Sequence, residues 1–363
     1  MKNTPEISIL MCVYNTDEEW LENSIKSILL QTFNDFEFII VVDCPTDGCE
    51  RVIYDYAKTD SRIVVINNTT NLGLTKSLNV ALEHAQGRFI ARMDSDDIAI
   101  GDRLEKQHDY MLKNESVVAV GSYIAAFGNN VITRGMNYFS DDYERERIHL
   151  LFANAGLAHP TAFIRKDFLD ANKIRYDERF QKSQDYALWV DITEKQGKLA
   201  MLEEILLLYR VSENQISKRS SKEQSECCMR IVNEQLINLV NATEDELKLH
   251  CDLYDMKYKH DMIECQNYLK KLIAANNEKG IYDKKMFKDE VYALWIRSAM
   301  HAIVKHGAVS YAFSSMFWKA LFEYRPLRLF LNSLQKNKKY ENMVSQAKNN
   351  IQEVQMQNIG GWL

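Results

Sequence analysis

The sequence predicts an α/β fold followed by a helical C-terminal region, and two observations carry this prediction. The first is a series of short apolar runs near the N-terminus that are separated by segments with helical periodicity. Such runs are typical of buried parallel strands in a layered α/β architecture. The second is a change of character beyond Asn214, where a single proline remains and apolar residues recur at three- and four-residue intervals.

Individual elements follow from these patterns. Strands are predicted at residues 7–13, 38–42, 63–66 and 89–90, and helices at residues 20–29 and 76–85. In the C-terminal region, Thr243 and Glu246 have the spacing of a capping box, which predicts the start of a helix there. No linker rich in glycine or proline marks a boundary. We place it near residue 220, which gives domains of 1–220 and 221–363.

The composition excludes several classes of protein. The 363 residues are 46% hydrophobic and 26% charged, as in ordinary globular proteins, and the formal charge of -6 argues against a nucleic-acid partner. Seven cysteines, two of them adjacent, cannot all pair within the chain, so a reducing, cytoplasmic compartment is expected. Neither a signal peptide nor an apolar run of about 18 to 20 residues is present, so we expect a soluble protein or one attached peripherally to the inner face of the cell membrane.

The acidic sequence Asp94-Ser95-Asp96-Asp97 is the sharpest candidate for a functional site. Its three carboxylates repel each other unless a cation lies among them, and hard divalent ions prefer oxygen ligands. The structural alternative is a solvated turn that caps the helix beginning near Asp102. A calcium loop of the EF-hand type is disfavoured, because its glycine and distal glutamate are missing.

Polar residues also follow the other predicted strands. Tyr14 and Asn15 follow the first strand, Asp43 the second, and residues 71–76 the third. Ligands of open α/β sheets bind outside the carboxyl ends of the strands, so we expect these residues to gather at one edge. Taken singly, Asp43 could be an ordinary turn carboxylate and Lys76 a solvated charge. Four polar strand ends in chain order favour a binding site.

With these residues the chain resembles the family 2 glycosyltransferases, which have the GT-A fold: a Rossmann-like, nucleotide-sugar-binding mixed sheet flanked by helices. The amino-acid sequence of residues 90–98 is similar to that found in the bacterial branch of the family that builds capsules, exopolysaccharide and O-antigen. The motifs that carry the resemblance extend over residues 5 to 217: Ile9-Leu10-Met11-Cys12-Val13-Tyr14-Asn15, Ser27-Ile28-Leu29-Leu30-Gln31-Thr32, Val41-Val42-Asp43, Asn71-Leu72-Gly73-Leu74, Asp94-Ser95-Asp96-Asp97, His159-Pro160-Thr161, Gln184-Asp185-Tyr186, Tyr209-Arg210 and Gln215-Ile216-Ser217.

The resemblance implies roles for the residues at the strand ends. Asp43 would bind the uracil ring of a UDP-sugar, and Tyr14 and Asn15 would line the nucleoside pocket. Independently of the resemblance, the position of Lys76 after the third strand makes it a candidate for contact with the diphosphate, the alternative being a solvated helix charge. The turn at 44–48 departs from the family pattern, which commonly has a second aspartate, a glycine and a serine there. We therefore expect a nucleoside pocket of different shape.

The resemblance also implies the catalytic groups. Asp94 and Asp96 would hold the ribose and a divalent cation, Mn²⁺ or Mg²⁺, which stabilises the departing diphosphate. Asp185 matches the family's catalytic base, which takes the proton of the acceptor hydroxyl while direct displacement inverts the anomeric centre. Tyr186 and Trp189 could form an acceptor platform beside it. The structural alternatives are that Asp185 is the N-cap of a helix and that Trp189 belongs to the core.

Three further positions qualify the resemblance. Gln184 stands where the family usually has glutamate, and Ser212 falls where many relatives carry a histidine that contacts metal or diphosphate. His159, which precedes a proline, is expected to be a hydrogen-bonded core or turn residue rather than a ligand.

The leading hypothesis is transfer of a hexose or N-acetylhexosamine from a UDP-sugar to a saccharide acceptor, lipid-linked in this branch, during synthesis of a bacterial surface polysaccharide. A sugar nucleotidyltransferase or an NAD enzyme would need a glycine-rich loop after the first strand, and residues 13–18 contain no glycine. The alternative hypothesis is a non-catalytic sugar- or nucleotide-binding assembly subunit with the same fold.

The C-terminal region matches no motif. Residues 316–331 interleave aromatic and basic side chains, and Lys336, Lys338 and Lys339 follow. Such a segment can lie at a membrane interface, pack as an amphipathic helix on the catalytic domain, or mediate a homo-oligomer.

Overall fold

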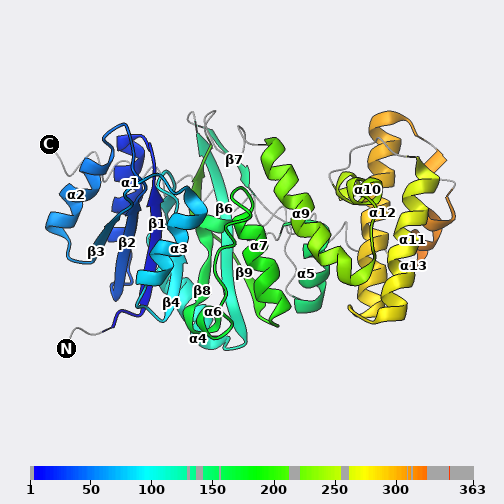
Figure 1. Cartoon of the computed structure of the whole chain (residues 1–363), viewed down its shortest axis with the longest axis horizontal. Helices are drawn as coiled ribbons and strands as arrows, with labels where there is room; N and C mark the ends of the chain where they lie inside the picture. The colour runs from blue at the N-terminus through cyan, green and yellow to red at the C-terminus, as the bar shows by residue number, and fades with distance from the viewer. Residues whose placement is uncertain are drawn as a thin grey trace. The chain divides into compact units, whose positions relative to one another are not determined.

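The computed structural model describes residues 4–128, 131–135, 142–154, 157–211, 221–254, 261–308, 310–311, 314–324 and 343. The chain forms two compact units (Figure 1). The first is built mainly from Met1–Phe139 and Gly156–Ser220, and the second from Ser140–Ala155 and Ser221–Lys339. The segment 140–155, which the predicted division at residue 220 assigns to the N-terminal domain, therefore packs with the C-terminal helices.

A nine-stranded mixed sheet forms the centre of the first unit, with the order β3-β2-β1-β4-β8-β6-β9-β5 and with β7 paired to β6. Strands β1 to β4 pair in parallel, whereas β8 runs antiparallel to both β4 and β6. The strands are β1 Ile7–Val13, β2 Phe36–Val42, β3 Ile63–Asn67, β4 Phe89–Arg92, β5 Ile98–Ala99, β6 Val117–Gly128, β7 Val131–Gly135, β8 Phe163–Arg165 and β9 Lys198–Arg210.

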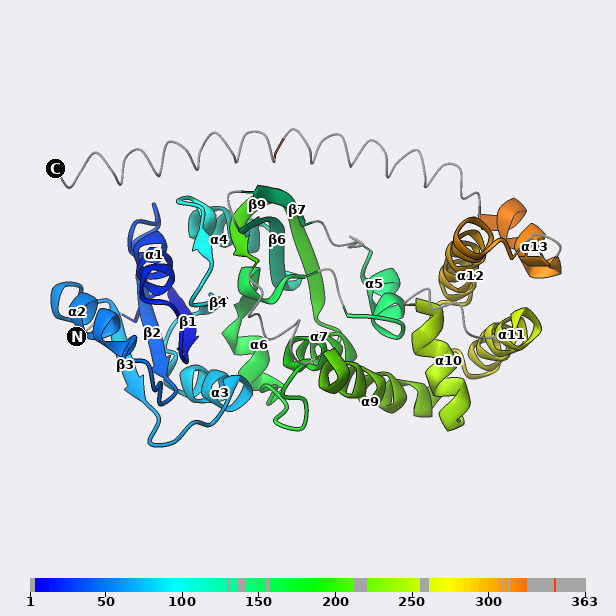
Figure 2. The same cartoon turned by 90° about the horizontal axis from the view of Figure 1, so that it is seen from above.

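The four predicted strands are confirmed as β1 to β4, and their burial explains the apolar runs. Six of the seven residues of β1 are buried, because helices cover both faces of the sheet at this strand. Ile7, Ile9 and Met11 share one cluster with apolar residues of α1, α2 and α4, whereas α3 packs on β1 and β2 from the opposite face (Figure 2).

The helices of the first unit are α1 Glu18–Leu29, α2 Glu50–Thr59, α3 Leu74–His84, α4 Arg103–Lys113, α6 Lys166–Ala171 and α7 Gln184–Glu194, with a 3-10 turn η1 at His159–Thr161. The two predicted helices are confirmed as α1 and α3. Asp17 begins α1, because its carboxylate accepts hydrogen bonds from the N–H groups of Glu19 and Trp20.

The second unit is helical, as predicted, and its helices begin and end at recognisable caps. Thr243 and Glu246 exchange the two hydrogen bonds of a capping box (3.0 and 3.2 Å), which confirms the predicted start of α10. Both α11 and α12 end in a left-handed glycine, Gly280 and Gly307. The helices are α5 Tyr143–Leu150, α9 Ser221–Leu239, α10 Glu244–Tyr254, α11 Met262–Lys279, α12 Lys284–His306 and α13 Ser315–Tyr324.

Residues 142–154 are held in the helical unit by contacts of several kinds. Arg145 forms an ion pair with Glu290, and the guanidinium of Arg147 lies 4.5 Å from the centre of the Tyr282 ring. Gln235 donates a hydrogen bond to the carbonyl oxygen of Leu150 at 3.1 Å. This segment is therefore a structural part of the helical unit, although it comes from the middle of the N-terminal sequence.

Within the described residues, none of the helices combines the length and the apolar character needed to cross a bilayer. Helix α13 covers the beginning of the aromatic and basic segment 316–331. The rest of that segment, together with Lys336, Lys338 and Lys339, lies outside the described residues.

Two buried histidines predict how the helical unit responds to acid. Burial lowers the pKa of both His149 and His250 to about 4, against an ordinary value near 6.5. The native state therefore binds fewer protons than the unfolded state, so stability is complete above about pH 6.5 and is lost as the pH falls towards 4. We expect each histidine to remove about 2 kcal/mol of stability by pH 5.

Thermal unfolding followed by circular dichroism from pH 7 to pH 5 checks this expectation. His250→Gln should flatten the pH dependence, whereas His84→Gln, at an exposed site on α3, should leave it unchanged. An equal pH dependence in the two variants would show that His250 is not responsible.

Candidate active site

The turns after β1, β2 and β4 leave the sheet at the same edge, because the three strands are parallel. The N–H of Asp43 donates to the Val13 carbonyl oxygen at 2.9 Å, and the N–H of Met93 donates to that of Leu10 at 3.0 Å. The turns that follow β2 and β4 therefore begin on either side of β1. This confirms that the polar strand ends gather at one edge.

The acidic turn after β4 brings three carboxylates together. One carboxylate oxygen each from Asp94, Asp96 and Asp97 lies within 4.8 Å of the others. The hydroxyl of Ser24 in α1 supports the turn by donating a hydrogen bond to the Asp94 carbonyl oxygen at 2.8 Å. The N-cap of α4, Asp102, makes no side-chain capping hydrogen bond. The acidic turn is therefore held by tertiary contacts and is not a solvated cap of α4.

Two arginines oppose the charge of this turn. The buried guanidinium of Arg92 contacts the Asp94 carboxylate. Arg210, at the end of β9, donates its backbone N–H to the Asp97 carboxylate and its Nε to the Asp96 carbonyl oxygen, both at 2.8 Å. Strand β9 therefore closes the side of the turn that faces away from β1.

The two arginines do not fully offset the cost of burying the carboxylates of Asp96 and Asp97. Burial, reinforced by the charge of Asp94, raises the pKa of Asp96 to about 6 and that of Asp97 well above its usual range. One oxygen of Asp97 is buried and has no hydrogen-bond partner among the residues that the structure describes. A divalent cation with oxygen ligands fits this donor set, and Asp94 and Asp96, which are less buried than Asp97, are the residues that could hold it.

The turn after β1 is linked to both neighbouring turns. Asn15, which adopts a left-handed conformation (φ 48°), accepts a hydrogen bond from the Thr46 N–H at 2.8 Å and donates one to the Thr46 hydroxyl at 3.2 Å. The hydroxyls of Thr16 and Ser95 lie 2.8 Å apart. Because Thr46 engages both polar atoms of Asn15, Asn15 supports the turn after β2, whereas the neighbouring Tyr14 is half-exposed.

Asp43 is buried and supports the loop that precedes α3. Its carboxylate accepts hydrogen bonds at 2.8 Å from the backbone N–H groups of Leu72 and Gly73 and from the side-chain amide of Asn68. The loop ends at Gly73, whose positive φ of 80° suits glycine. Asp43 is therefore more than an ordinary turn carboxylate.

Lys76 lies in the first turn of α3. Its ammonium group is 3.8 Å from the Glu178 carboxylate, and both side chains are about half exposed. An exposed ion pair of this length is weak, so Lys76 is available to an anionic ligand.

Asp185 lies in the first turn of α7. The N-cap of this helix is Ser183 and Gln184 is its first residue, so the alternative that Asp185 is the N-cap is wrong. The charges of Arg92, Asp185 and Asp94 all act on the buried hydroxyl of Tyr176, whose pKa burial raises. The predicted base and the acidic turn therefore lie near one buried group, although they are far apart in sequence.

Tyr176 was not among the predicted site residues. Its hydroxyl is 2.9 Å from Nε2 of His159, and its backbone exchanges two hydrogen bonds with the Asn79 side chain (2.8 and 2.9 Å). Burial lowers the pKa of His159 well below its usual range, so the ring is neutral, and the expectation that His159 is a hydrogen-bonded core residue is confirmed. No local sequence pattern marks Tyr176, because its neighbours come from distant segments.

The aromatic residues beside Asp185 do not form an acceptor platform. Tyr186 is 1% exposed and Trp189 is completely buried, so both rings belong to the core and the platform prediction is wrong. Two other compared positions, Ser212 and the sequence 215–217, lie outside the described residues.

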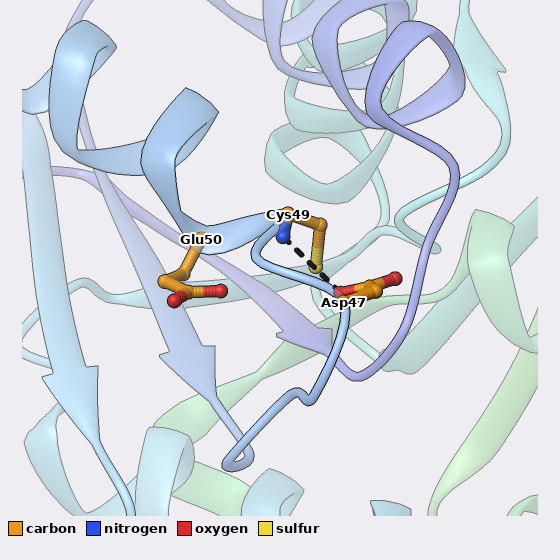
Figure 3. Close-up of side chains that lie close together, drawn as sticks. All are labelled: Asp47, Cys49 and Glu50. Carbon is orange, nitrogen blue, oxygen red and sulfur yellow. Dashed lines mark hydrogen bonds between the residues drawn. The ribbon is translucent and has the colours of Figure 1, made fainter.

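A second group of potential metal ligands, Asp47, Cys49 and Glu50, lies at the start of α2 (Figure 3). Asp47 accepts a hydrogen bond from the Cys49 N–H at 3.1 Å, as residues at helix starts commonly do. Burial raises the pKa of the Cys49 thiol to about 11, and a protonated thiol is a poor metal ligand. We interpret this group as support for the start of the helix.

Comparison with known proteins identifies relatives that are named as glycosyltransferases. Residues 8–172 match the model of Glycosyl transferase family 2. The chain is 36% identical over 211 residues to the uncharacterized glycosyltransferase MJ1057 of Methanocaldococcus jannaschii, covering 57% of this chain and 71% of that protein. It is 33% identical over 237 residues to the O-antigen biosynthesis glycosyltransferase WbnJ of Escherichia coli (63% and 89% covered). It is also 31% identical over 218 residues to WfgD of Escherichia coli, a UDP-Glc:alpha-D-GlcNAc-diphosphoundecaprenol beta-1,3-glucosyltransferase (60% and 81% covered).

Solved structures share the architecture at lower identity. Residues 1–349 of S. aureus TarS, in complex with UDP-GlcNAc, superimpose with a TM-score of 0.55 at 17% identity, covering 88% of this chain and 89% of that one. The mannosyltransferase PcManGT of Pyrobaculum calidifontis, in complex with GDP-Man and Mn²⁺, gives 0.52 at 15% identity (90% and 88% covered). The mixed sheet with flanking helices is thus the GT-A fold that the sequence predicted. The family match, together with relatives that the chain covers over more than two thirds of their length, shows that this chain belongs to glycosyl transferase family 2.

Proposed function

We propose that this chain transfers a hexose or N-acetylhexosamine from a UDP-sugar to a saccharide acceptor with inversion at the anomeric carbon. The observation that carries the proposal is the cluster of carboxylates at Asp94–Asp97, together with Asp185, whose charge acts with that of Asp94 on the buried hydroxyl of Tyr176. Such transfer needs a cation-binding group beside the donor diphosphate and a separate carboxylate beside the acceptor hydroxyl. The first unit supplies both, and we assign the transfer chemistry to it.

The donor side is built from the ends of β1, β2 and β4. Tyr14 packs on the nucleoside, Asp43 holds the loop beside the uracil ring, and Lys76 contacts the diphosphate. Asp94 and Asp96 would hold Mn²⁺ or Mg²⁺, which when bound stabilises the negative charge of the departing diphosphate.

The acceptor side depends on Asp185. Its carboxylate takes the proton of the incoming hydroxyl, whose oxygen then bonds to the anomeric carbon as the bond from that carbon to the diphosphate breaks. The reaction is a direct displacement and needs no covalent enzyme intermediate. Arg92 forms an ion pair with Asp94 and so neutralises part of its charge. This lowers the electrostatic cost of having both Asp94 and Asp185 near the buried hydroxyl of Tyr176.

The acceptor class follows from the relatives. WfgD acts on a saccharide linked through diphosphate to a polyprenol, and WbnJ serves O-antigen biosynthesis. We infer that this chain acts in synthesis of a bacterial surface polysaccharide on a lipid-linked acceptor, as a cytoplasmic enzyme at the inner face of the membrane. The helical unit would provide contacts with the acceptor, the membrane or a second copy of the chain.

The first test is release of nucleotide from UDP-, GDP-, CDP- and dTDP-sugars with and without Mn²⁺. We expect Mn²⁺-dependent release of UDP from one donor. Asp185→Asn should lower transfer to acceptor by about a thousandfold, because the base is lost, while UDP-sugar binding changes little. The matched control is Asp191→Asn, an exposed carboxylate on the same helix, which should retain transfer.

The assay also separates the proposal from a non-catalytic assembly subunit. Nucleotide binding by calorimetry without turnover of any donor and acceptor pair would favour the subunit. Full transfer activity in Asp185→Asn would exclude Asp185 as the base.

The acidic turn predicts a pH-dependent cation affinity. Because the pKa of Asp96 is raised to about 6, a proton competes with the cation below that pH, and at pH 5 only about a tenth of this group is ionised. We expect Mn²⁺ affinity, measured by calorimetry with UDP-sugar in the inactive Asp185→Asn variant, to fall about tenfold from pH 7 to pH 5. An affinity that is constant over this range would contradict the assignment of Asp96 as a ligand, and Asp96→Ala should abolish the Mn²⁺-dependent release.

Asp43 predicts a combined loss of stability and binding. Asp43→Asn places an amide NH₂ against backbone N–H donors, so we expect a loss of about 2 kcal/mol in urea unfolding together with weaker UDP binding. Asp47→Asn keeps an oxygen that can accept from the Cys49 N–H and should be nearly neutral. If Asp43→Asn weakened UDP binding without destabilising the protein, the carboxylate would act only as a ligand of the uracil ring and not as a support for the loop.

A further inference from the structure

The sequence separates charge along the chain. Residues 291–340 contain eight lysines and arginines and one acidic residue, Glu323, which gives a net charge of +7. Because the whole chain carries -6, the remaining residues carry -13. An overall acidic protein thus has one strongly basic stretch, and the sequence of residues 291–322 contains no acidic residue.

The second half of α12 presents part of this stretch to solvent on one helical stripe. Arg297, Met300 and Val304 are exposed and follow each other at intervals of about one helical turn, with Met300 46% and Val304 71% exposed. The exposed Lys305 lies next to Val304 in sequence. The opposite stripe is buried in the helical unit and consists of Trp295, Ala299 and Ala302. Apolar side chains this exposed are therefore not needed for the packing of α12.

Helix α13 adds an aromatic residue and a further lysine. Met316, Phe317 and Ala320 are buried, and α13 packs against α12. Trp318 is 48% exposed, and the neighbouring Lys319 is exposed. The two packed helices of the helical unit thus both combine exposed basic and apolar side chains.

We propose that the exposed basic and apolar side chains of these two helices, Arg297, Met300, Val304, Lys305, Trp318 and Lys319, together form a basic–apolar face that binds the surface of an anionic lipid bilayer. Lysine and arginine are attracted to anionic headgroups, while tryptophan and exposed aliphatic side chains enter the boundary between headgroups and acyl chains. The acidic remainder of the chain is repelled by the same surface, which favours contact through this face. A nucleic acid would match the charge but not the exposed Met300 and Val304.

The proposal deepens the proposed function, since a lipid-linked acceptor would lie in the bilayer that this face contacts. Binding itself is independent of catalysis. Failure of one can therefore be told from failure of the other by measuring both on the same protein.

The test is flotation of the full chain with vesicles of phosphatidylcholine and phosphatidylglycerol, compared with pure phosphatidylcholine. We expect binding to the anionic vesicles only, weakened by salt. The double variant Lys305→Glu/Lys319→Glu should weaken it about tenfold or more, and Trp318→Ser should weaken it while leaving its charge dependence intact. The matched control is Lys248→Glu/Lys270→Glu, which reverses two exposed charges on α10 and α11 of the same unit and should bind normally.

Three outcomes would overturn the proposal: no binding to anionic vesicles, equal loss in the control variant, or a concentration-dependent oligomer that Trp318→Ser abolishes in the absence of lipid. UDP release from the soluble donor should be unchanged in the Lys305→Glu/Lys319→Glu variant. Lipid binding by a chain that releases no nucleotide would support the face and refute the proposed catalysis.

Discussion

The incompletely neutralised charge at the end of β4 is the constraint on which the rest of the catalytic unit depends. Three neighbouring carboxylates, one of them fully buried, cost free energy unless positive charge is close, and here Arg92 of β4 and Arg210 at the end of β9 supply it. The guanidinium of Arg210 is itself held between the rings of Trp20 and Phe127, at 4.6 and 4.5 Å. Among the residues that the structure describes, one buried oxygen of Asp97 still has no hydrogen-bond partner, so the two arginines do not fully compensate the acidic turn.

Several polar side chains near the acidic turn join neighbouring loops by hydrogen bonds. Asn15 fixes the turn after β2, and Asp43 fixes the loop before α3. The hydroxyls of Thr16 and Ser95 join the turns after β1 and β4. These hydrogen bonds between loops hold exposed side chains such as Tyr14 in place, and the proposed nucleotide site requires such support because loops form it.

Features that depend on neighbouring residues could be predicted from the sequence. Features that depend on contacts between distant segments were missed. The apolar runs were sufficient for β1 to β4, and the capping box for the start of α10, because each depends on local chemistry. The antiparallel strand β8 and the support of Tyr176 by His159 and Asn79 depend on pairing between distant segments. The burial of Trp189 was missed for the same reason: an aromatic ring beside a predicted catalytic residue has the same sequence pattern whether it faces a sugar or the core.

The path of the chain also bears on whether the two units can be separated. After β7 the chain contributes residues 142–154 to the helical unit and then enters η1, where His159 contacts Tyr176. Ile148, Leu150 and Leu151 are buried in the full chain, and His250 of α10 bonds to the Leu151 carbonyl oxygen at 2.9 Å. A chain ending at residue 220 would keep this apolar segment without the helices that hold it. The residues of the candidate site belong to the first unit, whereas residues 142–154, which precede η1 in the chain, belong to the helical unit, so a truncation at residue 220 would divide the helical unit.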